Sequence, residues 1–237
     1  MAALNDHEIE LANVTFHYRE AGEASAPPLI LLHGLGDDAR GWDEIAPMLA
    51  ERYHVFALDQ RGNGESARPG VYSFELMRDD LKAFAGALGL DRFTLVGHSM
   101  GGSVSILFAE QWPERLVRLV LEDTPPPYPG GMDLSEPEPP AEAPEGEERP
   151  FDWQMLRAIV HQLRHPDPSW WNKLSTITTP SLVIAGGSTS HVPQDKLAEA
   201  ARLIPDCRFV TIEGAGHSVH KNRPQEFKGY LRDFLFD

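Results

Sequence analysis

The sequence contains a single cysteine, Cys207, among its 237 residues. One cysteine excludes a disulfide within the chain and is typical of a protein from a reducing compartment. The sequence also lacks a run of the roughly 20 apolar residues that a membrane-spanning helix needs. Its N-terminus has no basic start followed by an apolar stretch, which a secretory signal peptide would show. These absences predict a cytoplasmic protein without a membrane partner.

Positive charge is scarce, because 21 lysines and arginines stand against 36 aspartates and glutamates, for a formal net charge of −15. Nucleic acids and anionic membranes attract positive proteins, so this balance argues against both as partners. Apolar residues still make up 41% of the chain, which is enough for a folded core. The length predicts one domain with at most a small insertion.

Short apolar runs alternate with helical patterns over most of the chain. Segments 8–11 and 13–18 alternate apolar and polar residues, as in a hairpin at a sheet edge. Other runs are nearly continuous and typical of parallel strands buried on both faces: 29–33, 54–59, 92–97, 116–121, 181–185 and 207–212. Helical patterns lie at 42–51, 74–88, 99–111, 194–203 and 224–235. The alternation predicts an α/β fold, with a mostly parallel twisted sheet and helices on both faces.

This alternation is interrupted by a proline-rich, acidic stretch. Nine of the 20 prolines fall between Pro125 and Pro150. Residues 131–150 carry seven acidic side chains and one basic side chain, a net charge of −6. Because proline removes backbone donors and like charges repel, we expect a flexible loop at 131–150.

A helical pattern resumes at 152–163, before the next apolar run. We interpret residues 124–179 as a small lid inserted between two strands of one core domain, 1–123 and 180–237. A disordered linker between two domains is the alternative, but the residues beyond it are too few to fold alone.

One short motif indicates catalytic chemistry. Residues 97–101 read Gly-His-Ser-Met-Gly between an apolar run and a helical pattern, and Gly102 follows. Gly-x-Ser-x-Gly in this context is typical of a nucleophile elbow, where Ser99 occupies a strained turn and the glycines let the helix pack closely. A tight turn with an incidental serine is the structural alternative.

With this motif the sequence resembles the α/β-hydrolase superfamily, and three further segments agree. Residues 31–36 (Leu-Leu-His-Gly-Leu-Gly) resemble its oxyanion loop, and residues 59–66 (Asp-Gln-Arg-Gly-Asn-Gly-Glu-Ser) resemble its Asp-x-Arg-Gly turn. Residues 213–218 (Glu-Gly-Ala-Gly-His-Ser) resemble its histidine loop. The resemblance covers nearly the whole chain outside the acidic stretch. It implies an α/β-hydrolase fold and a serine hydrolase without cofactor or metal.

A serine hydroxyl is a weak nucleophile at neutral pH and needs a base that accepts its proton. Of the ten histidines, His217 is the best candidate, because it follows the last predicted strand in a Gly-Ala-Gly loop. We expect His33 to brace the oxyanion loop and His98 to pack beside the elbow.

The resemblance also implies the groups that stabilise an oxyanion. Two backbone N–H donors are needed, and they are assigned to Met100, directly after the nucleophile, and to Leu35, with Gly34 shaping the turn. The Asp-x-Arg-Gly turn is expected to be structural, with Asp59 and Arg61 paired.

The acid of the triad is where the sequence departs from the commonest family pattern. Most relatives carry an aspartate in the loop after the strand at 181–185, but residues 186–193 contain no carboxylate. In another branch the acid follows the sixth strand, which places it at Asp123. Glu122 is the alternative, although it points to the opposite side of an extended segment. An acid of the insertion or Asp195 comes last, because Asp195 is explained by the N-terminus of a helix.

Four side chains of the lid are candidates for a substrate pocket or for packing against the core: Trp153, Met155, Trp170 and Trp171. The sequence thus predicts an esterase- or lactonase-like carboxylesterase that acts on small molecules as a monomer or homodimer. A perhydrolase or a C–C bond hydrolase of the same fold is a second possibility. A non-catalytic ligand-binding protein is the alternative of a different class.

Overall fold

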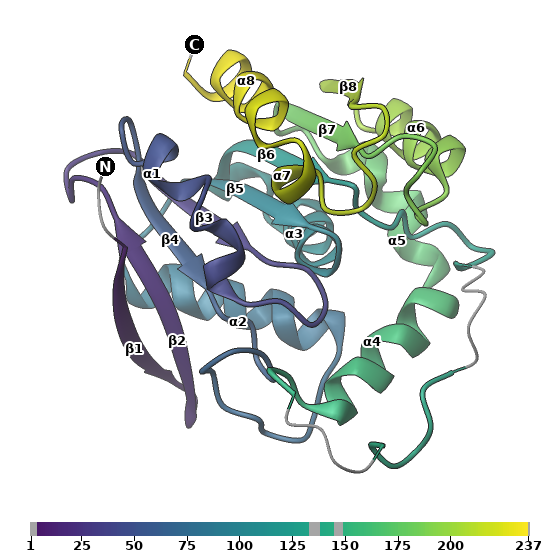
Figure 1. Cartoon of the computed structure of the whole chain (residues 1–237), viewed down its shortest axis with the longest axis horizontal. Coiled ribbons are helices and arrows are strands. Elements are labelled where there is room, and N and C mark those ends of the chain that lie inside the picture. Colours follow the sequence, from purple (N-terminus) through teal and green to yellow (C-terminus); the bar gives the residue numbers. More distant parts are fainter. Residues whose placement is uncertain (1–3, 133–137, 145–148, 237) are drawn as a thin grey trace.

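The computed structural model describes residues 4–132, 138–144 and 149–236. Its strands form an eight-stranded sheet in the order β1-β2-β4-β3-β5-β6-β7-β8 (Figure 1). Their bounds are Asn5–Leu11 (β1), Val14–Ala21 (β2), Pro28–Leu32 (β3), His54–Leu58 (β4), Phe93–His98 (β5), Leu116–Glu122 (β6), Ser181–Ala185 (β7) and Cys207–Thr211 (β8). The β1–β2 hairpin is antiparallel and lies at one edge, and the strands from β4 to β8 pair parallel. The predicted edge hairpin and mostly parallel sheet are confirmed.

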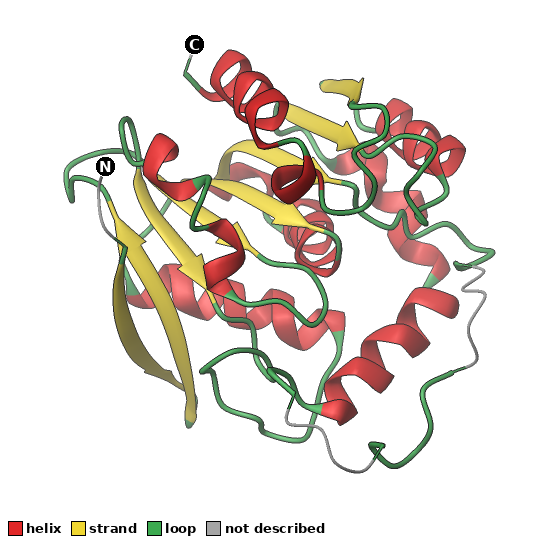
Figure 2. Cartoon of the chain, viewed as in Figure 1, coloured by secondary structure: helices red, strands yellow, loops and turns green. Residues whose placement is uncertain are grey.

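Helices cover both faces of the sheet (Figure 2). The longer ones are Phe74–Ala87 (α2), Met100–Gln111 (α3), Trp153–Arg164 (α4), Gln194–Leu203 (α6) and Pro224–Leu235 (α8). Shorter elements are Ala39–Trp42 (η1), Ala46–Leu49 (α1), Pro113–Arg115 (η2), Pro168–Lys173 (α5), Leu174–Thr176 (η3) and Val219–Asn222 (α7). None of the helices within the described ranges is long and apolar enough to cross a membrane.

Both faces of the sheet are packed against helices. Successive side chains of a strand point to opposite faces, so each strand contributes to two hydrophobic cores. In β3, Ile30 and Leu32 belong to the core that α2 and α3 cover, whereas Leu29 and Leu31 belong to the core beneath α1 and α8. Both sets are fully buried. This double burial is the physical reason why the parallel strands are nearly continuous apolar runs in the sequence.

The helix predicted at 42–51 is wrong in its extent. The structure has the 3-10 turn η1 and then the single turn α1, with Pro47 at the start of α1. A proline ring clashes with the carbonyl four residues earlier, so one helix cannot run through Pro47 from residue 42.

The predicted lid contains α4, α5 and η3 among its described residues. The helix α4 is capped at its N-terminus by Asp152, whose side chain accepts a hydrogen bond from the N–H of Gln154 at 2.9 Å. It buries Met155 and Ile159 against the core, and it is tied to the start of α2, where the N–H of Phe74 donates to Oε1 of Gln162 at 2.7 Å. The lid is thereby fastened to the element that follows β4.

Part of the predicted flexible loop lies outside the described residues, namely 133–137 and 145–148. The described segment 138–144 contacts one side of α4. Nε1 of Trp153 donates to the carbonyl of Pro140 at 2.9 Å, and Nε of Arg157 donates to the carbonyl of Pro139 at 3.3 Å. The flexibility of the loop and the division into core and lid stay predictions.

Candidate active site

The carboxyl ends of the parallel strands meet at one edge of the sheet, where ligands of open α/β folds bind. Gly34 follows β3, Ser99 follows β5, Asp123 follows β6, and His217 lies in the loop after β8. Side chains that are far apart in the sequence therefore approach each other at this edge.

Ser99 lies on a strained turn between β5 and α3. Its backbone has φ +49° and ψ −115°, a conformation that costs free energy for any residue other than glycine. A Cβ atom on Gly97 would lie 2.5 Å from the carbonyl oxygen of Gly101, and a Cβ atom on Gly101 would lie 2.5 Å from that of Leu32. Only glycine fits at both positions, so the Gly-x-Ser-x-Gly spacing is a packing requirement.

His217 joins Ser99 and Asp123 in one chain of hydrogen bonds. Its Nε2 lies 2.8 Å from Oγ of Ser99, and its Nδ1 lies 2.8 Å from Oδ2 of Asp123. An ionised carboxylate only accepts, so Nδ1 carries the hydrogen in this arrangement and Nε2 is left to accept from the Ser99 hydroxyl. The imidazole can therefore take up the serine proton.

Asp123 is fully buried and itself has a positive φ of 38°. Burial acts to raise the pKa of its carboxyl, but hydrogen bonds outweigh burial and hold the pKa below its ordinary value. Their donors are His217, Ser190, the N–H of Gly186 and Gln194. Asp123 is therefore ionised at neutral pH.

Glu122 faces the other side of the strand end, as the alternation of an extended segment predicts. It accepts hydrogen bonds from the N–H and from Nδ1 of His220, both at 2.8 Å, and it is fully buried. Burial acts to raise the pKa of Glu122, but the charges of His220 and His98 and the hydrogen bonds from His220 lower it below its ordinary value. The structure thus brings Asp123, and not Glu122, to His217, and it places Asp195 in the first turn of α6.

The loop after β3 passes directly over the turn at Ser99. A Cβ atom on Gly34 would lie 2.7 Å from Nδ1 of His98 and 3.3 Å from Cβ of Ser99, so no side chain fits there. The N–H of Gly101 donates to the carbonyl of His33 at 3.1 Å and ties α3 to this loop.

His33 fixes the same loop from within, as expected from the sequence. Its Nδ1 donates to the carbonyl of Gly34 at 2.8 Å, and its Nε2 accepts from the N–H of Gln60 at 3.1 Å. Met100 is the first residue of α3, where N–H groups have no acceptor within the helix. Leu35 follows Gly34, so the N–H groups assigned to the oxyanion belong to two segments packed against each other.

His98 lies behind the catalytic edge and contacts two other histidines. Its Nε2 donates to the carbonyl of His217 at 3.0 Å, and its ring centre lies 5.0 Å from that of His220. Burial lowers the pKa of His98 to about 4, although the charge of Glu122 opposes this shift. The ring is therefore neutral at pH 7 and holds the histidine loop as a neutral donor.

The predicted pairing of Asp59 with Arg61 is wrong. Arg61 binds both oxygens of Asp80 on α2, whereas Asp59 accepts from Nδ1 of His17 at 2.8 Å and from two backbone N–H groups. Asp59 is fully buried beneath its own turn, and a Cβ atom on Gly64 would lie 2.2 Å from its Oδ2. The backbone of the turn thus encloses the carboxylate, and the long arginine side chain extends outward to α2.

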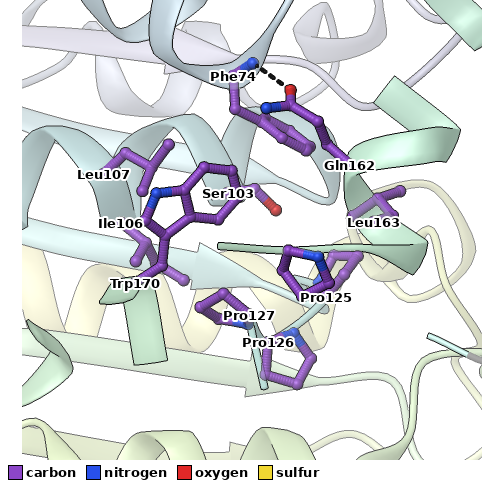
Figure 3. A pocket seen from close by; sticks show the side chains of 11 residues that line it. Phe74, Ser103, Ile106, Leu107, Pro125, Pro126, Pro127, Gln162, Leu163 and Trp170 are labelled. Atoms are coloured by element: carbon purple, nitrogen blue, oxygen red, sulfur yellow. Dashed lines mark hydrogen bonds between the residues drawn. The ribbon is translucent and has the colours of Figure 1, made fainter. Parts of the chain in front are cut away.

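Trp170, one of the four predicted pocket residues, lines a pocket close to α3 (Figure 3). The pocket has an empty volume of about 310 Å³, which includes space open to solvent. Its wall includes Ser103, whose N–H donates to the carbonyl of Ser99 one turn earlier at 3.0 Å. The rest of the lining is mainly apolar and includes Phe74, Ile106, Leu107, Pro125, Pro126, Pro127 and Leu163.

The other three candidates lie elsewhere. Met155 is fully buried against the backbone of Gly62, where a Cβ atom would come within 3.1 Å of it. Trp153 packs against the Arg149 guanidinium at 5.0 Å, and the ring of Trp171 lies 6.4 Å from that of Tyr128. Helical spacing alone does not distinguish these packing roles from pocket lining.

Four residues that contact Asp123, His217 or Glu122 were not predicted from the sequence: Ser190, Gln194, His191 and His220. The ring centre of His191 lies 4.1 Å from that of His217. One sequence feature could have indicated Ser190 and Gln194. The segment after β7 contains no carboxylate, so the acid of the triad has to come from the neighbouring strand β6, and polar side chains after β7 are then placed to contact it.

Among the residues that the structure describes, two groups of side chains have ligand atoms close enough together to hold a metal ion. Ligand atoms of His98, Glu122 and His220 lie within 4.8 Å of one another in the core, and those of Glu138, His161 and His165 do so on the surface. In the buried group, Glu122 accepts hydrogen bonds from Nδ1 of His220, whereas Nδ1 of His98 and Nε2 of His220 have no hydrogen-bond partner among the described residues.

A mostly parallel sheet, a serine on a strained strand-to-helix turn and a histidine after the last strand define an α/β hydrolase. The chain belongs to the α/β hydrolase fold family, whose model matches residues 27–153, more than half of its length.

Three relatives are similar over most of both chains. The sn-1-specific diacylglycerol lipase ABHD11 of Mus musculus is 28% identical, over 90% of this chain and 82% of its own. The putative carbamate hydrolase RutD of Pseudomonas syringae pv. syringae is 30% identical, over 93% and 98%. The putative esterase/lipase of Haemophilus influenzae is 26% identical, over 95% and 88%. A solved hydrolase from Pseudomonas aeruginosa superimposes with a TM-score of 0.83 at 25% identity, over 98% of this chain and 99% of that one.

Proposed function

We propose that this protein is a cofactor-free serine hydrolase that cleaves carboxylic esters or lactones of small molecules through an acyl-enzyme. The observation that carries the proposal is the unbroken hydrogen-bonded chain from Ser99 through His217 to Asp123. The buried and ionised Asp123 fixes the tautomer of His217 and stabilises its protonated form when it accepts the serine proton.

In the first half of the reaction, Oγ of Ser99 attacks the substrate carbonyl while Nε2 of His217 takes the hydroxyl proton. The negative charge moves to the carbonyl oxygen, where the N–H groups of Leu35 and Met100 stabilise it. The C–O bond to the alcohol then breaks, and His217 returns the proton to the leaving oxygen. The acyl group stays on Ser99.

In the second half, a water molecule gives its proton to Nε2 of His217 and attacks the acyl carbon. The same two N–H groups stabilise the second oxyanion. The bond to Ser99 breaks, its oxygen regains the proton, and the carboxylic acid leaves. A lactone follows the same course, but its alcohol and acid remain one molecule.

The names of the relatives support acyl transfer to water, because a lipase, an esterase/lipase and a carbamate hydrolase are among them. An apolar pocket, whose wall includes Ser103 one turn along α3 from Ser99, supports an apolar acyl group. Carbamates should be tested as substrates beside esters and lactones, because the relative named as a putative carbamate hydrolase is 30% identical over nearly its whole length.

The proposal is tested by Ser99→Ala. We expect the variant to fold and to lose at least roughly 10⁴-fold in kcat on p-nitrophenyl acetate, because no other group replaces the nucleophile. Wild-type protein should also react with a fluorophosphonate probe. The control is Ser25→Ala, which removes an exposed serine outside the site.

Hydrolysis by Ser99→Ala at nearly the wild-type rate would contradict the mechanism. A wild-type protein that neither reacts with the probe nor turns over any ester would instead be a binding protein of this fold. Peroxide-dependent turnover would reveal a perhydrolase, and cleavage of a vinylogous diketone would reveal a C–C bond hydrolase.

A further inference from the structure

The segment after β7, which carries no carboxylate, lies against the acid that β6 supplies. Ser190 donates from Oγ to Oδ2 of Asp123, and Gln194 donates from Nε2 to Oδ1 at 3.1 Å. We propose that Ser190 and Gln194 are positioning residues, which orient Asp123 and keep it ionised so that it can hold His217. This inference rests on the proposed serine hydrolase function.

The carboxylate of Asp123 is saturated by four donors. Oδ2 accepts from His217 and Ser190, while Oδ1 accepts from Gln194 and from the N–H of Gly186 at 2.8 Å. The side chain of Asp123 is 0% exposed. If one donor is lost, water can take its place only after the surrounding residues rearrange. Each donor therefore affects both the direction of the carboxylate and its charge.

Neighbouring backbone groups fix both side chains in their donor orientation. Oγ of Ser190 accepts from the N–H of Val192 at 3.1 Å, which leaves its hydroxyl hydrogen for Asp123. Oε1 of Gln194 accepts from the N–H of Gly187 at 3.1 Å, so its amide nitrogen faces the carboxylate. That nitrogen also donates to the carbonyl of Val192 at 2.8 Å. The segment is thus built to present two donors to an acid from another strand.

Loss of the Ser190 hydroxyl should change the titration of the site as well as its rate. Oδ2 of Asp123 would then accept a hydrogen bond from His217 alone. Because the negative charge of Asp123 would have one donor fewer, it would stabilise the protonated form of the His217 ring more strongly. The acid limb of the kcat/KM profile would then move to higher pH. The other titratable groups around the site are unchanged by the substitution: His98, His191, Glu122, His220 and Glu213.

Ser190→Ala is the first test, and Ser188→Ala in the same loop is its matched control. We expect Ser190→Ala to lower kcat about 10- to 100-fold, the effect of one hydrogen bond to a charged group, with KM unchanged. The acid limb should move up in pH, and Ser190→Thr should restore both rate and profile. Ser188→Ala should behave like wild type, because the N–H of Ser188, and not its hydroxyl, makes the contact with Glu213.

Gln194→Glu tests the second donor with a nearly isosteric change. Two carboxyl groups within hydrogen-bond distance cannot both ionise freely, so they would share a proton. While the proton is shared, the carboxyl group at residue 194 can still donate to Oδ1 of Asp123. We therefore expect kcat to fall at least about 10-fold as rising pH removes that proton and leaves two like charges side by side. Gln225→Glu, at an exposed position of α8, is the control for the added charge.

The outcomes separate this inference from the function on which it rests. An active Ser99→Ala variant would overturn the hydrolase mechanism itself. If Ser99→Ala is inactive while Ser190→Ala and Gln194→Glu keep the wild-type kcat and pH profile, the function stands and the positioning role is overturned. Variants that lose only melting temperature, with an unchanged pH profile, would overturn it as well.

Discussion

At the scale of single residues, two adjacent acids at the end of β6 serve two different histidines. Asp123 binds His217, and Glu122 binds His220, which lies three residues further along the chain in α7. Both carboxylates are fully buried, and hydrogen bonds and charges keep the pKa of each below its ordinary value in spite of burial. Their roles differ because Asp123 faces the histidine that contacts Ser99, whereas Glu122 faces a histidine buried in the core.

Asp123→Asn and Glu122→Gln should therefore have different effects. An amide at residue 123 would donate to Nδ1 of His217 or fail to orient it, and we expect kcat to fall by about 10⁴-fold in a folded protein. Glu122→Gln should keep most of kcat but lose about 2–3 kcal/mol of unfolding free energy, because a neutral amide is a weaker acceptor than the buried carboxylate for the hydrogen bonds from His220. Ester hydrolysis and urea unfolding of both variants measure this. A larger loss of kcat in Glu122→Gln, or in Asp195→Asn, would reassign the acid.

At the scale of elements, the strained turn between β5 and α3 sets the positions of several other segments. The glycines at its two sides let α3 approach β3, and the loop after β3 can then pass above Ser99. The lid element α5 places Trp170 against Phe74 of α2, with ring centres 6.0 Å apart in an edge-to-face arrangement. The pocket thus forms between α3, the prolines after β6 and the lid.

Trp170→Ala should widen this pocket. We expect the preference among p-nitrophenyl esters to move toward longer acyl chains, because the indole bounds the apolar space beside Ile106 and Leu107. The loss of a buried tryptophan costs about 3–5 kcal/mol, so Trp170→Phe serves as the milder variant. Trp153→Ala removes an equal side chain outside the pocket and should leave the chain-length preference unchanged. Identical chain-length profiles for all variants would show that acyl groups do not enter this pocket.

At the scale of the whole molecule, the buried histidine at the active edge couples stability to pH. His98 has a pKa of about 4 in the folded protein and takes up a proton near 6.5 when unfolded. Between these values the unfolded chain binds more protons, so the free energy of unfolding falls as pH falls.

From pH 7 to pH 5, His98 should account for a loss of about 2 kcal/mol in unfolding free energy. Urea unfolding of wild type and His98→Gln at both pH values isolates this contribution. The variant should lose about that much less between pH 7 and pH 5 than wild type does. An equal loss in both proteins would show that His98 does not titrate in this way.

Much of the fold could be predicted from the sequence because each signal is local. Parallel strands such as 181–185 and 54–58 are buried on both faces, so their apolar runs can be recognised from the sequence of the strand alone. The helix predicted at 42–51 is longer than the elements observed there. Its apolar residues have helical spacing, but Pro47 interrupts the helix. The pairing of Asp59 with Arg61 was wrong because both could reach other partners in three dimensions.

The sequence by itself determined the order of strands and helices and the candidates Ser99, His217 and Asp123. It could do so because glycine spacing, apolar periodicity and strand ends are properties of neighbouring residues. Only the tertiary structure decided which of two adjacent acids meets His217, which tryptophan lines the pocket and which side chains saturate Asp123. Those contacts join residues such as Asp123 and Gln194, 71 positions apart, and no local pattern encodes the direction in which two such side chains meet.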